Sequence, residues 1–193
     1  MHGRPVLPDT RMDPVKARAL TPFGVLRKAW AIMANEGISP GDREWLQPTP
    51  SPDGGFDRVT QGVILVIDDE TQILDSMRRT LIREGWVVLT ASDPAEGMQL
   101  YGEYWQAISL VLLDYFLPDK RGDQVWECLR TINPQARVLW MSASDDYIPP
   151  EMLNSGLCGF MMKPVTRKEL FRGIRKVLKS GGPPDPASDG QSA

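Results

Sequence analysis

Cysteine and histidine are scarce in this sequence. Its 193 residues include two cysteines, Cys128 and Cys158, and a single histidine, His2. Two cysteines do not make the disulfide framework of a small secreted domain, and both lie in apolar-patterned segments, where cysteine usually packs as a small hydrophobic residue. We therefore expect two free thiols in the core and no redox site.

A basic excess, an apolar leader and a membrane-length apolar run are also missing. The formal net charge is −3 at pH 7 and the pI is near 5.3, whereas nucleic-acid-binding proteins usually carry a basic excess or a basic face. No apolar run reaches the ~20 residues of a membrane-spanning helix, and no charged segment followed by an apolar one opens the chain. These absences favour a cytoplasmic protein whose partners are proteins or small molecules, with neither nucleic acid nor membrane among them.

The composition divides the chain into three parts. Residues 1–59 form an extension that ends in a linker rich in proline and glycine over 47–58, residues 60–180 form one domain, and residues 181–193 form a polar tail. The tail and much of the extension hold too few apolar residues to offset the entropy lost on ordering. We expect them to be disordered.

One segment of the extension has helical periodicity. Thr21 and Pro22 form a helix-start signal, Gly37 is a stop signal, and apolar side chains share one face between Leu26 and Met33. Isolated helices shorter than ~12 to 15 residues are marginal in water. We therefore expect this apolar stripe to dock, either on its own domain, on a second copy or on a partner.

Between residues 61 and 179 short apolar runs alternate with helical periodicity, which is typical of a parallel sheet with crossover helices. The run 63–67 (V-I-L-V-I) is apolar throughout, as in a central strand covered on both faces. We predict an α/β domain with a doubly wound, five-stranded parallel sheet. The predicted strands are 63–67, 86–90, 109–113, 137–141 and 158–162. The predicted helices are 71–84, 94–104, 122–132, a short one after Pro149-Pro150, and 166–179.

Polar residues follow four of these strands, at the carboxyl ends where such folds bind ligands. Carboxylates crowded into one partly buried site raise one another's pKa. A hard divalent cation such as Mg²⁺ relieves this repulsion by taking oxygen ligands. The sequence therefore predicts a magnesium site at this edge of the sheet. The residues at the strand ends are Asp68, Asp69 and Glu70 after the first strand, Asp114 after the third, Ser142 after the fourth, and Lys163-Pro164 after the fifth.

These separated motifs resemble the receiver domain of two-component response regulators. The resemblance covers residues 61 to about 180 and implies the flavodoxin-like receiver fold, with Mg²⁺ as cofactor. It implies a phosphoacceptor signalling domain, which is not an enzyme beyond its own phosphotransfer and slow self-dephosphorylation. The motifs are Asp68-Asp69, Asp114 in D-Y-F-L-P-D-K-R-G, Ser142-Ala143 in W-M-S-A-S, and Lys163-Pro164 in G-F-M-M-K-P-V.

The resemblance also assigns a role to each position. Asp114 matches the aspartate that accepts a phosphoryl group from a phosphohistidine, and Asp68 and Asp69 match the acidic pair that holds Mg²⁺. Phosphoryl transfer depends mainly on positioning and charge stabilisation, which these residue types supply. The remaining assignments are the backbone carbonyl of Phe116 as a metal ligand, Ser142 as the hydroxyl that turns toward the phosphoryl group, Lys163 as its cationic partner, Phe160 as the aromatic switch, Ser144 as a position that influences hydrolysis, and Pro164 as the cis-proline.

Each feature taken alone has a simpler interpretation. The acidic run fits a helix start, where carboxylates are favourable. Lys163 fits a solvated lysine, and Phe160 fits a core residue. The basic residues of 167–179 lie largely opposite the apolar ones, which favours a solvated face over a partner surface.

Other functional classes need motifs that the chain lacks. There is no G-x-x-x-x-G-K-[ST] for an NTPase and no G-x-G-x-x-G after the first strand for a dinucleotide-binding protein. A phosphatase of the haloacid dehalogenase type needs a second aspartate two residues after Asp68, and Glu70 stands there. The remaining alternative is a phosphorylation-independent interaction module with the receiver fold.

The predicted partners follow from the receiver role. A histidine kinase or a histidine phosphotransfer protein would be the donor, because His2 alone does not suggest a donor histidine in this chain. Thirteen residues follow position 180, too few for an output domain. We therefore expect output through an unknown protein target, or a place within a phosphorelay; a phosphorylation-dependent dimer stays open.

Overall fold

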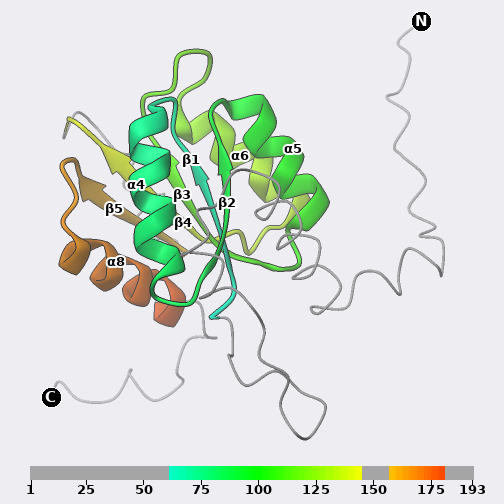
Figure 1. Ribbon diagram of the computed structural model, residues 1–193. Coiled ribbons are helices and arrows are strands. Elements are labelled where there is room, and N and C mark those ends of the chain that lie inside the picture. Colours follow the sequence, from blue (N-terminus) through cyan, green and yellow to red (C-terminus); the bar gives the residue numbers. More distant parts are fainter. Residues whose placement is uncertain (1–60, 145–156, 181–193) are drawn as a thin grey trace, which may run out of the picture.

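The computed structural model describes residues 61–144 and 157–180. These residues form a five-stranded parallel sheet in the order β2-β1-β3-β4-β5, with helices on both faces (Figure 1). The predicted helix near Thr21, the short helix after Pro149-Pro150 and the tail lie outside the described residues. The strands are β1 Val63–Ile67, β2 Val87–Ala91, β3 Ile108–Asp114, β4 Val138–Ser142 and β5 Cys158–Met162. The helices are α4 Thr71–Ile82, α5 Pro94–Tyr104, α6 Gly122–Ile132 and α8 Arg167–Ser180.

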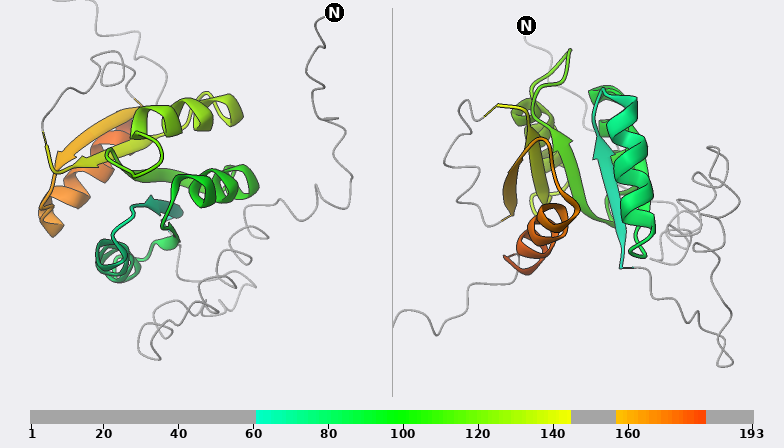
Figure 2. Two further views of the ribbon diagram at one scale, coloured as in Figure 1. Left: turned by 90° about the horizontal axis from the view of Figure 1, so that it is seen from above. Right: turned by 60° about the vertical axis from the view of Figure 1, so that its left-hand side comes forward.

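The sheet lies between two helix layers, with α4 and α8 on one face and α5 and α6 on the other (Figures 1 and 2). Neighbouring residues of β4 show the alternation: Leu139 lies against Gly173 of α8, whereas Trp140 packs on Trp126 of α6 with ring centroids 5.9 Å apart. All five residues of β1 are fully buried. The doubly wound prediction is confirmed, and β1 has the two-sided burial that its continuous apolar run indicated.

Local sequence signals fix where the helices begin and end. Asp93 caps α5, accepting a hydrogen bond from the Glu96 amide at 2.9 Å, and Pro94 occupies the first helical turn. After α4 the chain turns at Gly85, whose φ of 86° is favourable for a residue without a Cβ atom. The Trp86 amide donates to the Leu81 carbonyl in this turn, so β2 begins one residue later than predicted.

Strands β1 and β5 and helices α5 and α6 have the predicted bounds, and the remaining boundaries differ from the prediction by one or two residues. Strand β3 extends over Ile108–Asp114, and β4 ends at Ser142 instead of the residue before it. Two of the chemically distinctive residues, Asp114 and Ser142, are therefore the last residues of buried strands. Their backbones are held by the sheet ladder, which leaves their side chains at its carboxyl edge.

Candidate functional site

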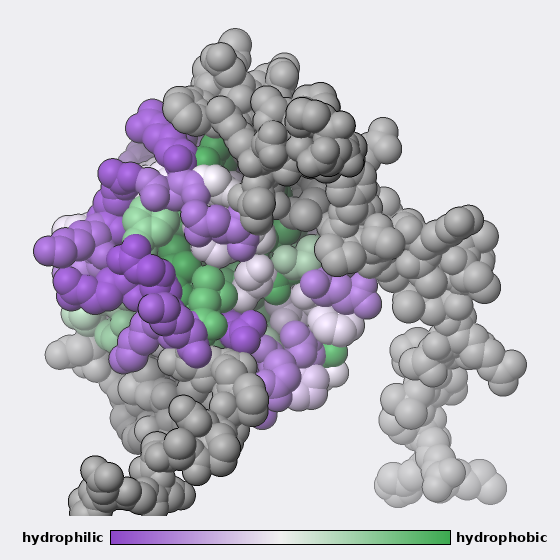
Figure 3. All heavy atoms as spheres, turned by 90° about the horizontal axis from the view of Figure 1, so that it is seen from below, coloured by the Kyte–Doolittle hydropathy of each residue, from purple (hydrophilic) through white to green (hydrophobic). Residues whose placement is uncertain are grey.

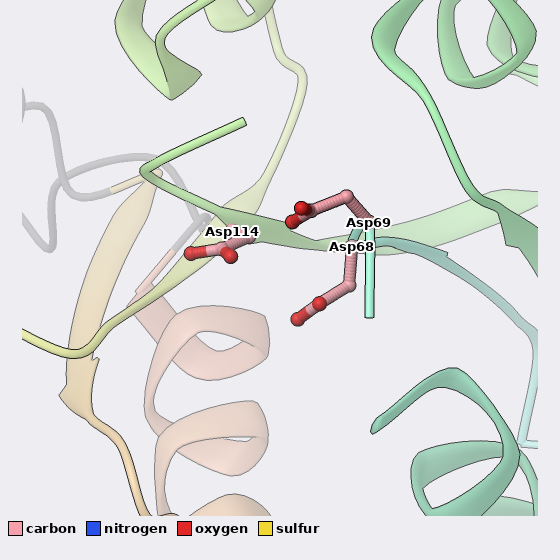
Figure 4. Close-up of side chains that lie close together, drawn as sticks. All are labelled: Asp68, Asp69 and Asp114. Atoms are coloured by element: carbon pink, nitrogen blue, oxygen red, sulfur yellow. The ribbon is translucent and has the colours of Figure 1, made fainter. Parts of the chain in front are cut away.

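Three carboxylates converge at the carboxyl edge of the sheet. Asp68 follows β1, Asp69 is next in the chain, and Asp114 ends β3; one oxygen of each lies within 4.8 Å of the others. Figure 4 shows the three side chains lying close together at the ends of neighbouring strands. Asp68 and Asp114 are buried, whereas Asp69 is exposed to solvent. Neighbouring parallel strands bring together residues that are 46 positions apart, as the sequence predicted.

Lys163 follows β5 and neutralises part of this charge. Its Nζ lies 2.8 Å from Asp68 Oδ2 and 2.9 Å from Asp114 Oδ2, where it donates a hydrogen bond. The side chain of Lys163 is only 13% exposed. The Lys163–Pro164 peptide bond is cis, the geometry that the family resemblance implies. Lys163 is therefore part of the acidic cluster and not a solvated surface lysine.

Burial and neighbouring charges have opposite effects on the pKa of Asp68 and on that of Lys163, and both pKa values are raised. Burial raises the pKa of Asp68, and contact with Lys163 and the hydrogen bond from the Glu70 amide offset only part of that effect. Burial alone would lower the pKa of Lys163, but contacts with Asp68 and Asp114 outweigh it and raise that pKa. Lys163 therefore stays cationic at neutral pH, and further positive charge beside Asp68 would favour its ionised form.

The donor set fits a hard divalent cation. Asp68 Oδ2 is fully buried and accepts no well-aligned hydrogen bond, although the ammonium lies beside it. Three carboxylate oxygens within 4.8 Å of one another, one of them from a solvent-accessible residue, are of the type that Mg²⁺ binds when it keeps several waters. The net charge of the three aspartates with Lys163 is −2, which a divalent cation balances.

The loop after β3 is shaped around Asp114. The Phe116 amide donates to Asp114 Oδ1 at 3.3 Å, and the Gly122 amide donates to the Tyr115 carbonyl at 2.9 Å. The ring of Phe116 is 43% exposed and packs edge-on against Tyr115, with centroids 5.1 Å apart. This loop places an apolar ring two residues after the carboxylate that ends β3.

Ser142 ends β4 beside this cluster, and its side chain is turned to its own loop. The hydroxyl donates to the Ser144 carbonyl at 2.8 Å and accepts from the Ser144 amide at 3.2 Å. Its backbone carbonyl accepts from the Lys163 amide at 2.7 Å. The ladder between β4 and β5 therefore brings Ser142 and Lys163 to neighbouring positions at the sheet edge.

The structure also shows the burial of Phe160, of the two cysteines and of the basic residues of α8, but this burial does not assign them a function. Phe160 in β5 is half-buried and packs on the core, which suits both of its interpretations. Cys128 and Cys158 are not bonded to each other in a disulfide, and both are half-buried, so neither lies fully in the core, where we expected them. The basic residues of α8 are exposed, and Figure 3 shows strongly hydrophilic residues on the side where α8 lies.

The sequence interpretation missed one contact of this site. Glu70, assigned only to the acidic run before α4, places Oε1 3.6 Å from Lys163 Nζ. The two residues are 93 positions apart, and the contact depends on two flexible side chains. The signal available in the sequence was the adjacency of Glu70 to Asp68 and Asp69, both predicted to lie at the same edge.

The fold and the acidic site together define a class of signalling domain, and comparison with known proteins agrees. The family model of the response regulator receiver domain matches residues 64–175, more than half of the chain. Within 61–144 and 157–180, no helix is both long and apolar enough to cross a membrane. The chain belongs to the response regulator receiver domain family.

Similar proteins and structures come from several organisms. The chain is 33% identical over 124 residues to the transcriptional regulatory protein YkoG of Bacillus subtilis, covering 63% of this chain and 53% of that protein. It is 31% identical over 118 residues to the transcriptional regulatory protein AfsQ1 of Streptomyces coelicolor, covering 61% and 52%. The chain thus spans about half the length of the curated relatives that it matches.

Solved receiver domains have the same fold. A receiver domain protein from Clostridium thermocellum superposes with a TM-score of 0.56 at 28% identity, covering 61% of this chain and 94% of that one. A CheY-like receiver domain protein from Methanospirillum hungatei superposes with a TM-score of 0.54 at 30% identity, covering 62% and 95%. Residues 60–180, predicted as one domain, contain the whole family match.

Proposed function

We propose that this receiver domain is a phosphoacceptor, which takes a phosphoryl group from a phosphohistidine onto Asp114. The observation that carries the proposal is the position of Asp114. It ends the buried strand β3, and its two oxygens have different partners: Oδ2 accepts from the Lys163 ammonium at 2.9 Å, and Oδ1 accepts from the Phe116 amide at 3.3 Å. A carboxylate held in this way has a fixed orientation at the edge where other charged groups converge.

The neighbouring side chains supply charge stabilisation for a transferring phosphoryl group. Such a group spreads negative charge over its equatorial oxygens. Lys163 is already beside Asp114 Oδ2, and Ser142 ends the adjacent strand with a hydroxyl that can donate. We propose that the Lys163 ammonium and the Ser142 hydroxyl bind oxygens of the phosphoryl group, in place of the groups that they contact now. Asp114 would then form the new O–P bond as the histidine nitrogen leaves with the electron pair of the broken N–P bond.

We assign the divalent cation to Asp68, Asp69 and Asp114, with the Phe116 carbonyl as a further ligand. When bound, Mg²⁺ would neutralise negative charge on the phosphoryl oxygens. The buried and poorly bonded Asp68 Oδ2, and the closeness of the three carboxylates, support this assignment. The chain's own residues orient the acceptor oxygen and keep the cluster together before any ligand arrives.

The donor and the readout are also proposals. A histidine kinase or histidine phosphotransfer protein would bring the phosphohistidine to this edge. A change at Ser142 would leave room for half-buried Phe160 to turn inward, and this movement would signal through protein contacts. The target, a phosphorylation-dependent dimer, the cytoplasmic location and the docking role of residues 1–59 stay predictions.

A mass measurement tests the phosphoacceptor proposal. The full chain is incubated with a small-molecule phosphodonor and Mg²⁺, and intact mass is recorded with and without a chelator. We expect one added phosphoryl group, on the peptide that contains Asp114, and its loss in the Asp114→Asn variant. Asp119→Asn is the matched control, because it changes an exposed aspartate of the same loop and should leave uptake intact.

Two results would reject this function. Phosphate found on the Asp114→Asn protein, in the peptide around that position, would refute the acceptor assignment. Absence of phosphate from the wild-type chain with every donor tried, including a phosphorylated histidine phosphotransfer protein, would favour the phosphorylation-independent interaction module. Amide spectra of the variants would show that the fold is retained in each case.

A further inference from the structure

Lys163 lies on the border between the buried cluster and the solvent-facing rim. It contacts three carboxylates, and only Asp68 and Asp114 belong to the candidate cation site. The third is Glu70, whose Oε1 lies 3.6 Å from Lys163 Nζ. The side chain of Glu70 is 62% exposed, whereas those of Asp68 and Asp114 are 0% and 7% exposed. Glu70 is therefore the partner of Lys163 on the open side.

The backbone of Glu70 is fixed, whereas its carboxylate has no structural task at the helix start. Its amide donates to Asp68 Oδ1 at 3.0 Å, and its carbonyl accepts from the amides of Ile73 and Leu74 at 2.9 and 3.1 Å. Glu70 is the N-cap residue of α4, but its side chain makes no capping hydrogen bond. The anchored backbone keeps this carboxylate near Lys163, and the side chain is free to follow the ammonium.

A divalent cation and the Lys163 ammonium compete for the same carboxylates. The ammonium already lies within 3 Å of Asp68 Oδ2 and Asp114 Oδ2. Two cations of like sign repel strongly at such short separation. Binding of Mg²⁺ to the aspartates must therefore move the ammonium away from them, and Glu70 is the carboxylate that contacts it on the outward path.

We propose that Glu70 is a positioning residue, which holds the Lys163 ammonium when a divalent cation displaces it from Asp68. The proposal rests on the divalent-cation site proposed above. Held by Glu70, the lysine stays at the mouth of the site and remains close enough to meet a phosphoryl group on Asp114. Glu70 thereby lowers the free energy of the cation-bound state through Lys163, beyond its general attraction for positive charge.

A double-mutant cycle separates these two effects. Mg²⁺ is titrated into the full chain as wild type, Glu70→Gln, Lys163→Met and the double variant, and dissociation constants are obtained from amide chemical shifts by NMR. With Lys163 present, Glu70→Gln should weaken Mg²⁺ binding by about two- to fivefold, the range of a partly exposed ion pair. In the Lys163→Met background the same substitution should have a clearly smaller effect.

A second measurement needs no substitution of Lys163. The side-chain resonances of Lys163 are compared between wild type and Glu70→Gln, first without Mg²⁺ and then at saturation. The proposal expects the larger difference at saturation, because Glu70 is then the main partner of the ammonium. Retained amide shifts in the remaining strands would show that the exposed substitution leaves the fold unchanged.

Three outcomes would overturn the inference. Equal effects of Glu70→Gln in the two backgrounds would mean that Glu70 acts only as a negative charge. Tighter Mg²⁺ binding by Glu70→Gln would mean that Glu70 stabilises the metal-free state, in which the Lys163 ammonium contacts Asp68 and Asp114. If the wild-type chain showed no saturable Mg²⁺ binding, the proposed cation site itself would be refuted. This result differs from the other two, in which Mg²⁺ still binds.

Discussion

The Ser142 hydroxyl is hydrogen-bonded twice to the backbone of Ser144. It donates to the Ser144 carbonyl at 2.8 Å and accepts from the Ser144 amide at 3.2 Å. A hydroxyl has one hydrogen to donate, so Ser142 cannot serve this carbonyl and a phosphoryl group together. Two arrangements of one side chain therefore compete, because the single hydroxyl hydrogen is donated to a different acceptor in each.

Ser142→Ala should slow phosphorylation of Asp114 and weaken retention of the phosphoryl group. The variant lacks the donor for a phosphoryl oxygen, and loss of one such donor typically costs a factor of about a hundred or more in buried catalytic sites. Because the edge of this site is open to solvent, we expect about tenfold. The rate of phosphate uptake from a small-molecule donor, followed by intact mass, measures the effect.

Ser144→Ala is the control for this prediction. It removes a side-chain hydroxyl two residues away but keeps the backbone amide and carbonyl that bind Ser142. The control should phosphorylate nearly as fast as wild type. Equal slowing by both substitutions would mean that the loop conformation matters and not the Ser142 donor.

Asp68→Asn should stabilise the protein in the absence of metal. Burial raises the pKa of Asp68 above its ordinary value of 3.8, so the fold disfavours the ionised form. Lys163 would keep Asp114 and Glu70 as partners after the substitution. Replacing a poorly compensated buried charge by a neutral group of the same shape should raise the free energy of unfolding by about 1 kcal/mol at pH 7. Urea unfolding in a chelator measures it.

The pH dependence of the Asp68→Asn effect has a fixed sign. A carboxyl whose pKa is raised in the folded state adds stability below the unfolded value and loses it as pH rises through the folded value. The advantage of Asp68→Asn should therefore shrink as pH is lowered toward 3.8. Mg²⁺ should reverse the order at neutral pH by stabilising the wild type more. A variant less stable than wild type in chelator at pH 7 would contradict the argument.

The fold, and the closeness of Asp68, Asp114 and Lys163, could be predicted from the sequence for physical reasons. A continuous apolar run, such as 63–67, indicates a strand buried on both faces, and parallel strands present their carboxyl ends at one edge. Residues directly after strands, such as Asp68 and Lys163, could therefore be placed together from their positions in the chain. The carboxylates among these residues then indicated a hard divalent cation as the ligand.

Contacts that depend on side-chain rotamers could not be predicted in this way. The pairing of Glu70 with Lys163 joins residues 93 positions apart through flexible side chains. The two bonds from Ser142 to Ser144 depend on one rotamer of a small hydroxyl. Strand β2 begins one residue later than predicted because the Trp86 amide donates to the Leu81 carbonyl at the end of α4. The periodicity of apolar residues does not indicate such a hydrogen bond.

Two glycines of α5 should respond oppositely to alanine. A Cβ at Gly97 would lie 2.5 Å from Cδ1 of Ile67, which is fully buried in β1. Gly97→Ala should therefore lower the free energy of unfolding by about 1 to 3 kcal/mol, as overpacking does. Gly102 is exposed and its nearest neighbour would be 3.9 Å away. Gly102→Ala should raise stability by up to about 1 kcal/mol through helix propensity.

Denaturant unfolding of the two alanine variants checks this pair. The chemical change and the helix are the same, so the difference between them reports only the space beside each position. Because Ile67 precedes Asp68, Gly97→Ala should also shift the amide resonance of Asp68. Similar stability changes in both variants would show that α5 moves away from β1 to accept the methyl group.

Phe116 should give the phosphorylated protein a long lifetime. The residue stands two positions after Asp114, its ring is 43% exposed, and its amide is tied to Asp114 Oδ1. An apolar ring at this position cannot orient a water molecule, and we expect it to shield an acyl phosphate on Asp114 from one, because exclusion of water protects reactive intermediates. A polar side chain here could orient the attacking water, and Ser144 has too short a side chain to replace it.

The Phe116→Asn variant tests the shielding argument. It should lose phosphate about ten times faster than wild type, a difference of about 1.4 kcal/mol in the barrier. Phe116→Leu keeps an apolar side chain and the backbone amide, so it should resemble wild type. Loss of phosphate from purified protein is timed in Mg²⁺ buffer by intact mass. A wild-type half-life equal to or shorter than that of Phe116→Asn would show that the ring does not exclude water, because an amide in its place would then have given water no better access to the acyl phosphate.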